Sequence, residues 1–143
     1  MAQNRSEMDP ATEWQSATVM VVEDDPVCLR IITRALEDRG YKILSAASGQ
    51  EALKLSYEYL ETIDLLFTDF FMPGLNGREL ALRVQRLRPG IKILYMTGYM
   101  NRLIHVASSL DGWSEDILAK PIPPETLDEV IQASLKNTPK AGC

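Results

Sequence analysis

The chain has 143 residues, of which 45% are hydrophobic and 24% charged, and its formal net charge is -5 at pH 7. This length fits one domain with a buried core. The acidic balance and the lack of any basic cluster argue against a nucleic-acid-binding surface, which normally carries a basic excess. No signal peptide and no apolar run of transmembrane length is visible, so we expect a cytoplasmic protein with no membrane contact.

The first predicted elements lie between residues 18 and 60. Residues 1–17 are polar and are interpreted as an N-terminal extension. A strand over 18–22 leads to Asp25, which fits a helix N-cap, and Pro26 fits the first helical position. This helix ends before Gly40 and carries apolar residues at helical spacing, namely Cys28, Ile31, Ile32, Ala35 and Leu36. A strand over 41–47 then leads to a helix near 50–60, whose expected inner face is Ala52, Leu53, Ser56, Tyr59 and Leu60.

The second half of the chain repeats this alternation. A strand over 64–68 precedes a loop from Asp69 to Gly77 and a helix that ends at Pro89-Gly90. The remaining predicted elements are a strand over 92–96, a weaker helix over 101–110, a strand over 116–119, a helix from Pro124 and a tail over 137–143. Such alternation predicts an α/β fold, a doubly wound parallel sheet with helices on both sides. Short apolar strands are typical of strands buried on both faces.

Polar side chains follow four of the predicted strands. They are Glu23, Asp24 and Asp25 after the first, Asp69 after the third, Thr97 after the fourth and Lys120 after the fifth. The carboxyl ends of parallel strands meet at one edge of the sheet, so we expect these groups to lie together. Neighbouring carboxylates repel unless a cation balances them, and few carboxylates with retained water suit Mg²⁺ better than Ca²⁺. Metal, hydroxyl and ammonium around one carboxylate predict a phosphoryl acceptor.

Residues 18–136 resemble a response regulator receiver domain of two-component signalling. The motifs that carry the resemblance are Val22-Glu23-Asp24-Asp25-Pro26, Asp69 with Met72-Pro73-Gly74 and Gly77, Met96-Thr97-Gly98, and Lys120-Pro121. The resemblance implies a flavodoxin-like (βα)5 fold with strand order 2-1-3-4-5. It also implies that a histidine kinase or a histidine phosphotransfer protein phosphorylates the chain.

The resemblance assigns a role to each polar group. Asp69 would be the phosphoacceptor, and Thr97 and Lys120 would hold the phosphoryl oxygens. Glu23, Asp24 and Asp69 would bind Mg²⁺, Glu23 through a water molecule, and the main-chain carbonyl of Phe71 would complete the metal site. Asp25 matches no family ligand and keeps its capping role.

The chain departs from the family at one position that matters for signalling. The family often carries an aromatic switch residue three positions before the lysine, and this chain has Ile117 there. We therefore expect the signal to pass through Thr97 and the loop over 98–102 to the helix over 101–110, and to act on a partner surface or a homodimer. Met8, Trp14 and Trp113 are candidates for that surface. His105, the single histidine, is interpreted as a surface or packing residue, and Cys28 as a buried thiol.

Two other functions are weighed against this interpretation. A haloacid-dehalogenase-like phosphatase, which also forms an aspartyl phosphate, needs a second acid at the position of Phe71. A flavodoxin-like cofactor binder needs a Gly-rich, hydroxyl-bearing loop after the first strand, where three consecutive acids would repel a phosphate. Within the receiver hypothesis, a free single-domain regulator is favoured, and a phosphorelay intermediate of a hybrid kinase system stays open.

Overall fold

The computed structural model describes residues 17–99 and 116–136 and contains a five-stranded parallel sheet. The strands are β1 (Thr18–Val22), β2 (Lys42–Ala46), β3 (Leu65–Asp69), β4 (Lys92–Thr97) and β5 (Asp116–Ala119). Their order, β2-β1-β3-β4-β5, confirms the predicted flavodoxin-like fold. The predicted helix over 101–110, His105, Trp113 and the two chain ends, including Met8, Trp14 and Cys143, lie outside the described residues.

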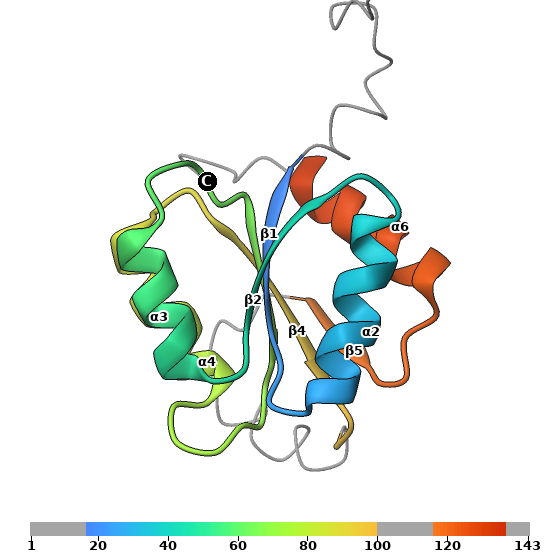
Figure 1. Ribbon diagram of the computed structural model, residues 1–143, viewed down its shortest axis with the longest axis horizontal. Helices are drawn as coiled ribbons and strands as arrows, with labels where there is room; N and C mark the ends of the chain where they lie inside the picture. Colours follow the sequence, from blue (N-terminus) through green and yellow to red (C-terminus); the bar gives the residue numbers. More distant parts are fainter. Residues whose placement is uncertain (1–16, 100–115, 137–143) are drawn as a thin grey trace, which may run out of the picture.

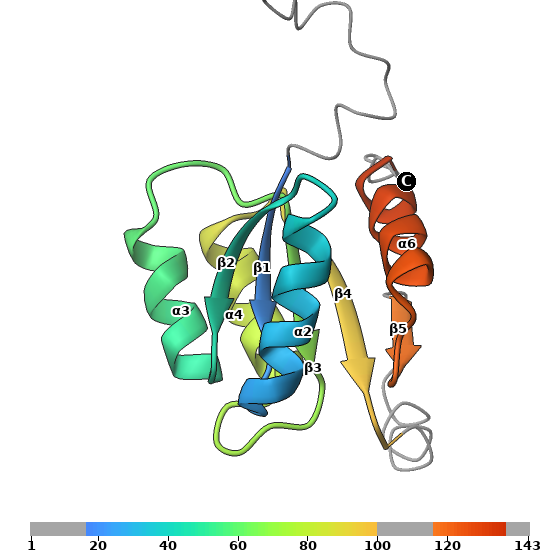
Figure 2. The same ribbon diagram turned by 45° about the vertical axis from the view of Figure 1, so that its right-hand side comes forward.

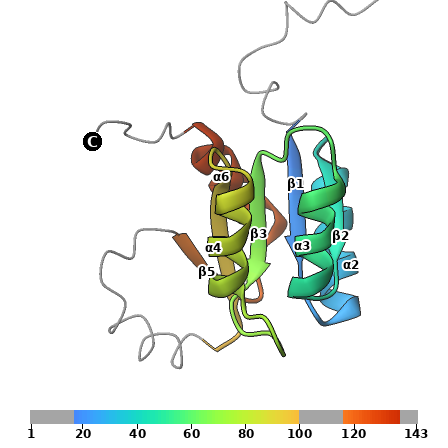
Figure 3. The same ribbon diagram turned by 90° about the vertical axis from the view of Figure 1, so that its left-hand side faces the viewer.

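Helices cover both faces of the sheet. They are α2 (Pro26–Glu37), α3 (Gly49–Glu58), α4 (Gly77–Leu87) and α6 (Pro124–Lys136). The helices α2 and α6 lie on one face (Figures 1 and 2), and α3 and α4 lie on the other (Figure 3). Among the described residues, no helix has the length and apolarity needed to cross a bilayer.

The central strands of the sheet are the most deeply buried. Every residue of β1 and β3 is buried, as expected for strands covered on both faces. The expectation of full burial is wrong for β2, in which Lys42 and Ser45 are exposed. Among the described strands, β2 lies at the edge of the sheet and has β1 as its single neighbour, so Lys42 and Ser45 are not covered as the central strands are.

The predicted start of α2 is confirmed. The Asp25 carboxylate accepts hydrogen bonds from the N–H groups of Val27 (3.0 Å) and Cys28 (3.5 Å), and Pro26 begins the helix. The inner face is narrower than expected, because α2 buries Ile32 and Leu36 but leaves Ile31 62% exposed. Cys28 is half-buried, not fully buried as predicted.

The end of α3 differs from the prediction. The helix ends at Glu58, the Tyr59 backbone is extended, and Leu60 is 96% exposed, so Leu60 is no part of the core. The cause is Arg88, at the end of α4. Its guanidinium group donates hydrogen bonds to the carbonyl oxygens of Ser56 (3.1 and 3.2 Å), Tyr59 and Glu61 (2.8 Å). These contacts draw the chain away from the helical path.

Candidate functional site

Asp69 is the last residue of β3 and is 5% exposed. The main chain of the next residue, Phe70, is held from two sides, since its N–H donates to Met96 O on β4 (2.9 Å) and its carbonyl oxygen accepts the N–H of Gly77 (2.9 Å). A methyl group on Gly77 would lie 2.2 Å from the carbonyl oxygen of Asp69. Only glycine fits such a close approach, so the start of α4 is packed directly against the peptide of Asp69.

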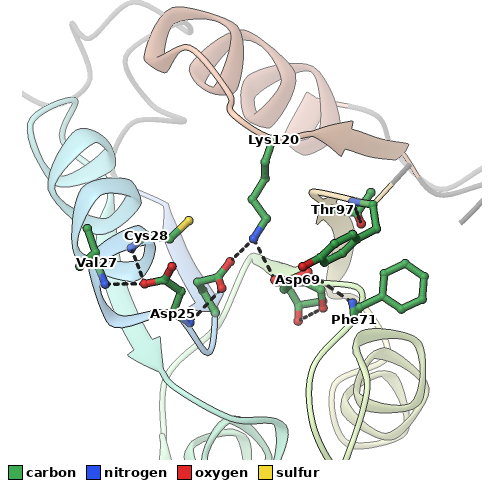
Figure 4. A network of polar contacts seen from close by, with 10 residues as sticks. Asp25, Val27, Cys28, Asp69, Phe71, Thr97 and Lys120 are labelled. Carbon is green, nitrogen blue, oxygen red and sulfur yellow. Dashed lines mark hydrogen bonds and ion pairs between the residues drawn. The ribbon is translucent and has the colours of Figure 1, made fainter. Parts of the chain in front are cut away.

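Lys120 follows β5 and reaches across the sheet edge toward the acids (Figure 4). Its ammonium group lies 2.7 Å from Glu23 Oε1 and 2.9 Å from Asp69 Oδ2. The main-chain N–H of Lys120 donates to Thr97 O (2.8 Å), which holds the start of the loop after β5 against the end of β4. The peptide bond between Lys120 and Pro121 is cis. Lys120 is therefore paired with Asp69, and its contact with Glu23 is an addition that the sequence did not predict.

Three carboxylates meet at this edge. Glu23, Asp24 and Asp69 each offer one oxygen within 4.8 Å of the others. Glu23 is 1% exposed, and its second oxygen, Oε2, accepts the N–H of Asp25 (3.0 Å). Three acids facing one ammonium leave a net negative charge, and carboxylate oxygens are the ligands that Mg²⁺ prefers. The residues present therefore fit a divalent metal ion.

The ionisable groups in this cluster shift one another's pKa values. Burial raises the pKa of Asp69 to about 6; the Lys120 hydrogen bond opposes this rise, and the charge of Glu23 adds to it. Burial would also raise the pKa of Glu23, but hydrogen bonds from Lys120 and Asp25 outweigh it and hold that pKa below its ordinary value. Burial and the neighbouring Glu23 raise the pKa of Asp24. Burial disfavours the charged form of Lys120, yet its contacts with Glu23 and Asp69 raise its pKa overall.

The two other predicted site residues are Phe71, two positions after the end of β3, and Thr97, at the end of β4. The main-chain N–H of Phe71 donates to Asp69 Oδ1 (3.3 Å). Thr97, the last residue of β4, is fully buried, and its Oγ1 accepts the N–H of Tyr99 (2.9 Å). Ile117 on β5 pairs with Tyr95 on β4. The structure thus brings Glu23, Asp24, Asp69 and Lys120 together and places Thr97 one residue beyond Met96, the sheet partner of Asp69.

Comparison with known proteins gives consistent matches. Residues 19–132 match the model of the response regulator receiver domain. The chain is 32% identical over 119 residues to the putative two-component response regulator ARR21 of Arabidopsis thaliana, covering 83% of this chain and 19% of that protein. It is 35% identical over 100 residues to the sensor kinase CckA of Brucella abortus, covering 69% of this chain and 11% of that protein. The chain therefore spans less than a fifth of the length of these two relatives.

Solved structures agree with the sequence matches. The receiver domain from the hybrid histidine kinase CckA superposes with a TM-score of 0.71 at 32% identity, covering 84% of this chain and all of that one. A receiver domain protein from Clostridium thermocellum superposes with a TM-score of 0.70 at 26% identity, covering 83% and 94% of the two chains. The family model spans most of the chain, and the sheet order and the acidic edge agree with it. The chain belongs to the response regulator receiver domain family of two-component signalling.

Proposed function

We propose that this chain is a single-domain response regulator that accepts a phosphoryl group on Asp69 from the phosphohistidine of a histidine kinase or a histidine phosphotransfer protein. The observation that carries this proposal is the environment of Asp69. It is a buried carboxylate at a strand end, with the ammonium of Lys120 at 2.9 Å from one oxygen and the N–H of Phe71 at 3.3 Å from the other.

Different residues would have different roles in phosphoryl transfer. A carboxylate oxygen of Asp69 attacks phosphorus as the P–N bond of the donor breaks, and that bond's electron pair stays on the imidazole nitrogen, which takes up a proton from water. Lys120 and the hydroxyl of Thr97 hold the oxygens of the transferred group and balance their charge. Phosphorylation then changes the contacts of the chain with other proteins. Besides its own phosphorylation and dephosphorylation, we propose no catalytic activity.

A metal ion fits the same edge of the sheet. We propose that Glu23, Asp24 and Asp69 bind Mg²⁺ together with the main-chain carbonyl of Phe71, and that Glu23 acts through a water molecule. The support is the set of carboxylate oxygens within 4.8 Å of one another. When bound, the ion would offset the charge of the acids and of the incoming phosphoryl group.

The surface beside the acceptor supports a protein donor. Val27 and Ile31 on α2 are 60% and 62% exposed. They line a groove of about 440 Å³ that also includes Lys120, Pro121 and Ile122. A donor must bring its histidine to Asp69, and Lys120 borders both the groove and the acceptor. We propose that a helix of the donor covers this apolar surface, and that the encounter takes place in the cytoplasm.

Phosphorylation is tested by intact mass. Acetyl phosphate with Mg²⁺ should add one phosphate to the wild-type chain and none to Asp69→Asn. The matched control is Asp38→Asn, at an exposed carboxylate at the end of α2. Persistence of the phosphate in Asp69→Asn would contradict the assignment of the acceptor.

A second role is favoured by the similarity to the receiver of the hybrid histidine kinase CckA. In that role the chain would be a phosphorelay intermediate and would pass its phosphate on to a histidine phosphotransfer protein. Incubating the phosphorylated chain with candidate phosphotransfer proteins separates the roles. Rapid loss of phosphate to one of them would support the relay, and retention would support the free regulator.

A further inference from the structure

Tyr95 is a buried aromatic residue next to Ile117. It lies on β4 between Thr68 of β3 and Ile117 of β5, and it is fully buried. Ile117 packs against the same core cluster that contains Tyr95. A large aromatic side chain is thus present next to the position that lacks one, but on the neighbouring strand.

Four aromatic rings connect this position with the acceptor site. The ring of Tyr99 contacts that of Phe71 with centroids 6.3 Å apart, Phe71 contacts Phe70 at 4.9 Å, and Phe70 contacts Tyr95 at 5.5 Å, each in an edge-to-face arrangement. We refer to Tyr99, Phe71, Phe70 and Tyr95 as the aromatic chain. At its far end the hydroxyl of Tyr95 accepts a hydrogen bond from Arg78 Nη1 on α4, at 3.5 Å. Edge-to-face contacts favour particular ring orientations, so displacement of one ring is felt by the next.

The near end of the aromatic chain is attached to the acceptor site by main-chain hydrogen bonds. The N–H of Phe71 donates to Asp69 Oδ1 (3.3 Å), and the N–H of Tyr99 donates to Thr97 Oγ1 (2.9 Å). A phosphoryl group on Asp69 acts on both hydrogen bonds, because it lowers the negative charge on the carboxylate oxygen that accepts from Phe71 and it accepts the hydroxyl proton of Thr97, which draws Thr97 Oγ1 toward Asp69. Both residues that begin the aromatic chain therefore respond to the same event.

The start of α4 is packed closely against Phe70, so a movement of Phe70 would also move the start of this helix. The N–H of Gly77 donates to Phe70 O (2.9 Å), and a methyl group on Gly77 would lie 2.9 Å from Phe70 Cα. Arg78, the next residue, holds Tyr95. Close-packed contacts of this kind transmit small displacements as changes between discrete packing arrangements.

We propose that the aromatic chain transmits the phosphorylation state of Asp69 to the start of α4, and that the contact between Tyr95 and Arg78 is its final link. This inference rests on the phosphorylation of Asp69 proposed above. It makes α4 an element that responds to the signal, in a chain whose β5 carries Ile117 in place of an aromatic residue.

The test is hydrogen exchange of the full chain with and without excess acetyl phosphate and Mg²⁺, read on peptides covering 76–87. The wild-type chain should change its exchange rate in α4 by about threefold or more on phosphorylation. Tyr95→Phe and Arg78→Met each remove the final link and should reduce that change to less than about half, while intact mass shows undiminished phosphorylation. The double variant should reduce the change in α4 exchange no further than either single variant does, because both substitutions remove the same contact. Tyr57→Phe, at an exposed ring on α3, is the matched control and should behave as wild type.

The outcomes separate this inference from the function on which it rests. A wild-type chain that gains no phosphate overturns the proposed function and the inference with it. A phosphorylated wild-type chain whose α4 exchange is unchanged overturns the inference alone. So does a full α4 response in Tyr95→Phe and Arg78→Met, since the signal would then reach α4 by another route.

Discussion

Lys120 bridges two carboxylates, with its ammonium group 2.7 Å from Glu23 Oε1 and 2.9 Å from Asp69 Oδ2. Both acids are almost fully buried. Without metal, this one cation therefore balances a pair of charges that would otherwise repel each other at short range. Lys120 is thus important for stability as well as for the proposed chemistry.

Replacing Lys120 with Met should destabilise the metal-free protein by ~3 kcal/mol at about pH 8, because two buried carboxylates lose their counter-ion. The pKa of each acid rises when the cation is removed, so both take up protons as the pH falls. The loss should therefore shrink toward about pH 5, where protonation relieves the repulsion. Urea unfolding at both pH values measures this effect. Lys54→Met, in an exposed pair with Glu58, should change stability little at either pH; an equal loss at both pH values in Lys120→Met would contradict the explanation.

Magnesium should stabilise the chain above about pH 6 and lose this effect below it. The pKa of Asp69 is raised to about 6, so below that value protons compete with the metal for its carboxylate. At a roughly tenfold excess over Kd, the gain in unfolding free energy should be about 1.4 kcal/mol. Thermal unfolding with Mg²⁺ or with a chelator, across this pH range, measures it. Asp24→Asn should abolish the metal response and raise metal-free stability; a melting temperature indifferent to millimolar Mg²⁺ would count against the site.

Phe71→Asn should shorten the lifetime of the phosphorylated state. Hydrolysis needs a water molecule in line with the bond between phosphorus and the Asp69 oxygen. The rings of Phe71 and Tyr99 lie 6.3 Å apart and line a groove of about 380 Å³. Neither ring can orient a water molecule as an amide can. The decay of the phosphorylated mass after removal of the phosphodonor measures the rate, and an unchanged or slower decay would show that Phe71 does not border the water path.

Arg88→Met should destabilise the fold by about 2 kcal/mol, because it leaves carbonyl groups at the end of α3 without their charged donor. Chemical unfolding measures the change. Arg83→Met, at an exposed position on α4, is the matched control and should cost little. Phosphorylation of the folded variant should be unaffected, since Arg88 contacts the main chain of residues 56–61 and not the acidic edge.

The strands and the acidic edge could be predicted from sequence because each depends on local patterns, whereas the strand order was implied by the resemblance to the receiver family. Apolar runs of strand length mark buried strands, and the polar residue after each run marks the sheet edge. The cap of α2 was predictable for the same reason, since Asp25 and Pro26 are adjacent and suit the first turn of a helix.

The features that the sequence did not predict depend on contacts between distant residues. The end of α3 is set by Arg88, which is 32 residues from Ser56. Ile31 is exposed in a groove that it lines with Pro121 and Ile122, which are far from it in the chain. The pairing of Lys120 with Glu23 spans 97 residues, and the aromatic chain joins the ends of β3 and β4. Periodicity within one segment carries no information on such contacts.

Each residue of the turn between β1 and α2 has its own structural position or contact. Within three consecutive positions, Glu23 accepts hydrogen bonds from Lys120 and from the N–H of Asp25, Asp24 faces solvent beside the acidic edge, and the Asp25 carboxylate caps α2. Inserting one residue between Val22 and Pro26 would move an acid away from the edge or the cap away from the helix. We expect this turn to tolerate exchange of side chains far better than any change in length, in contrast to the ordinary behaviour of surface loops.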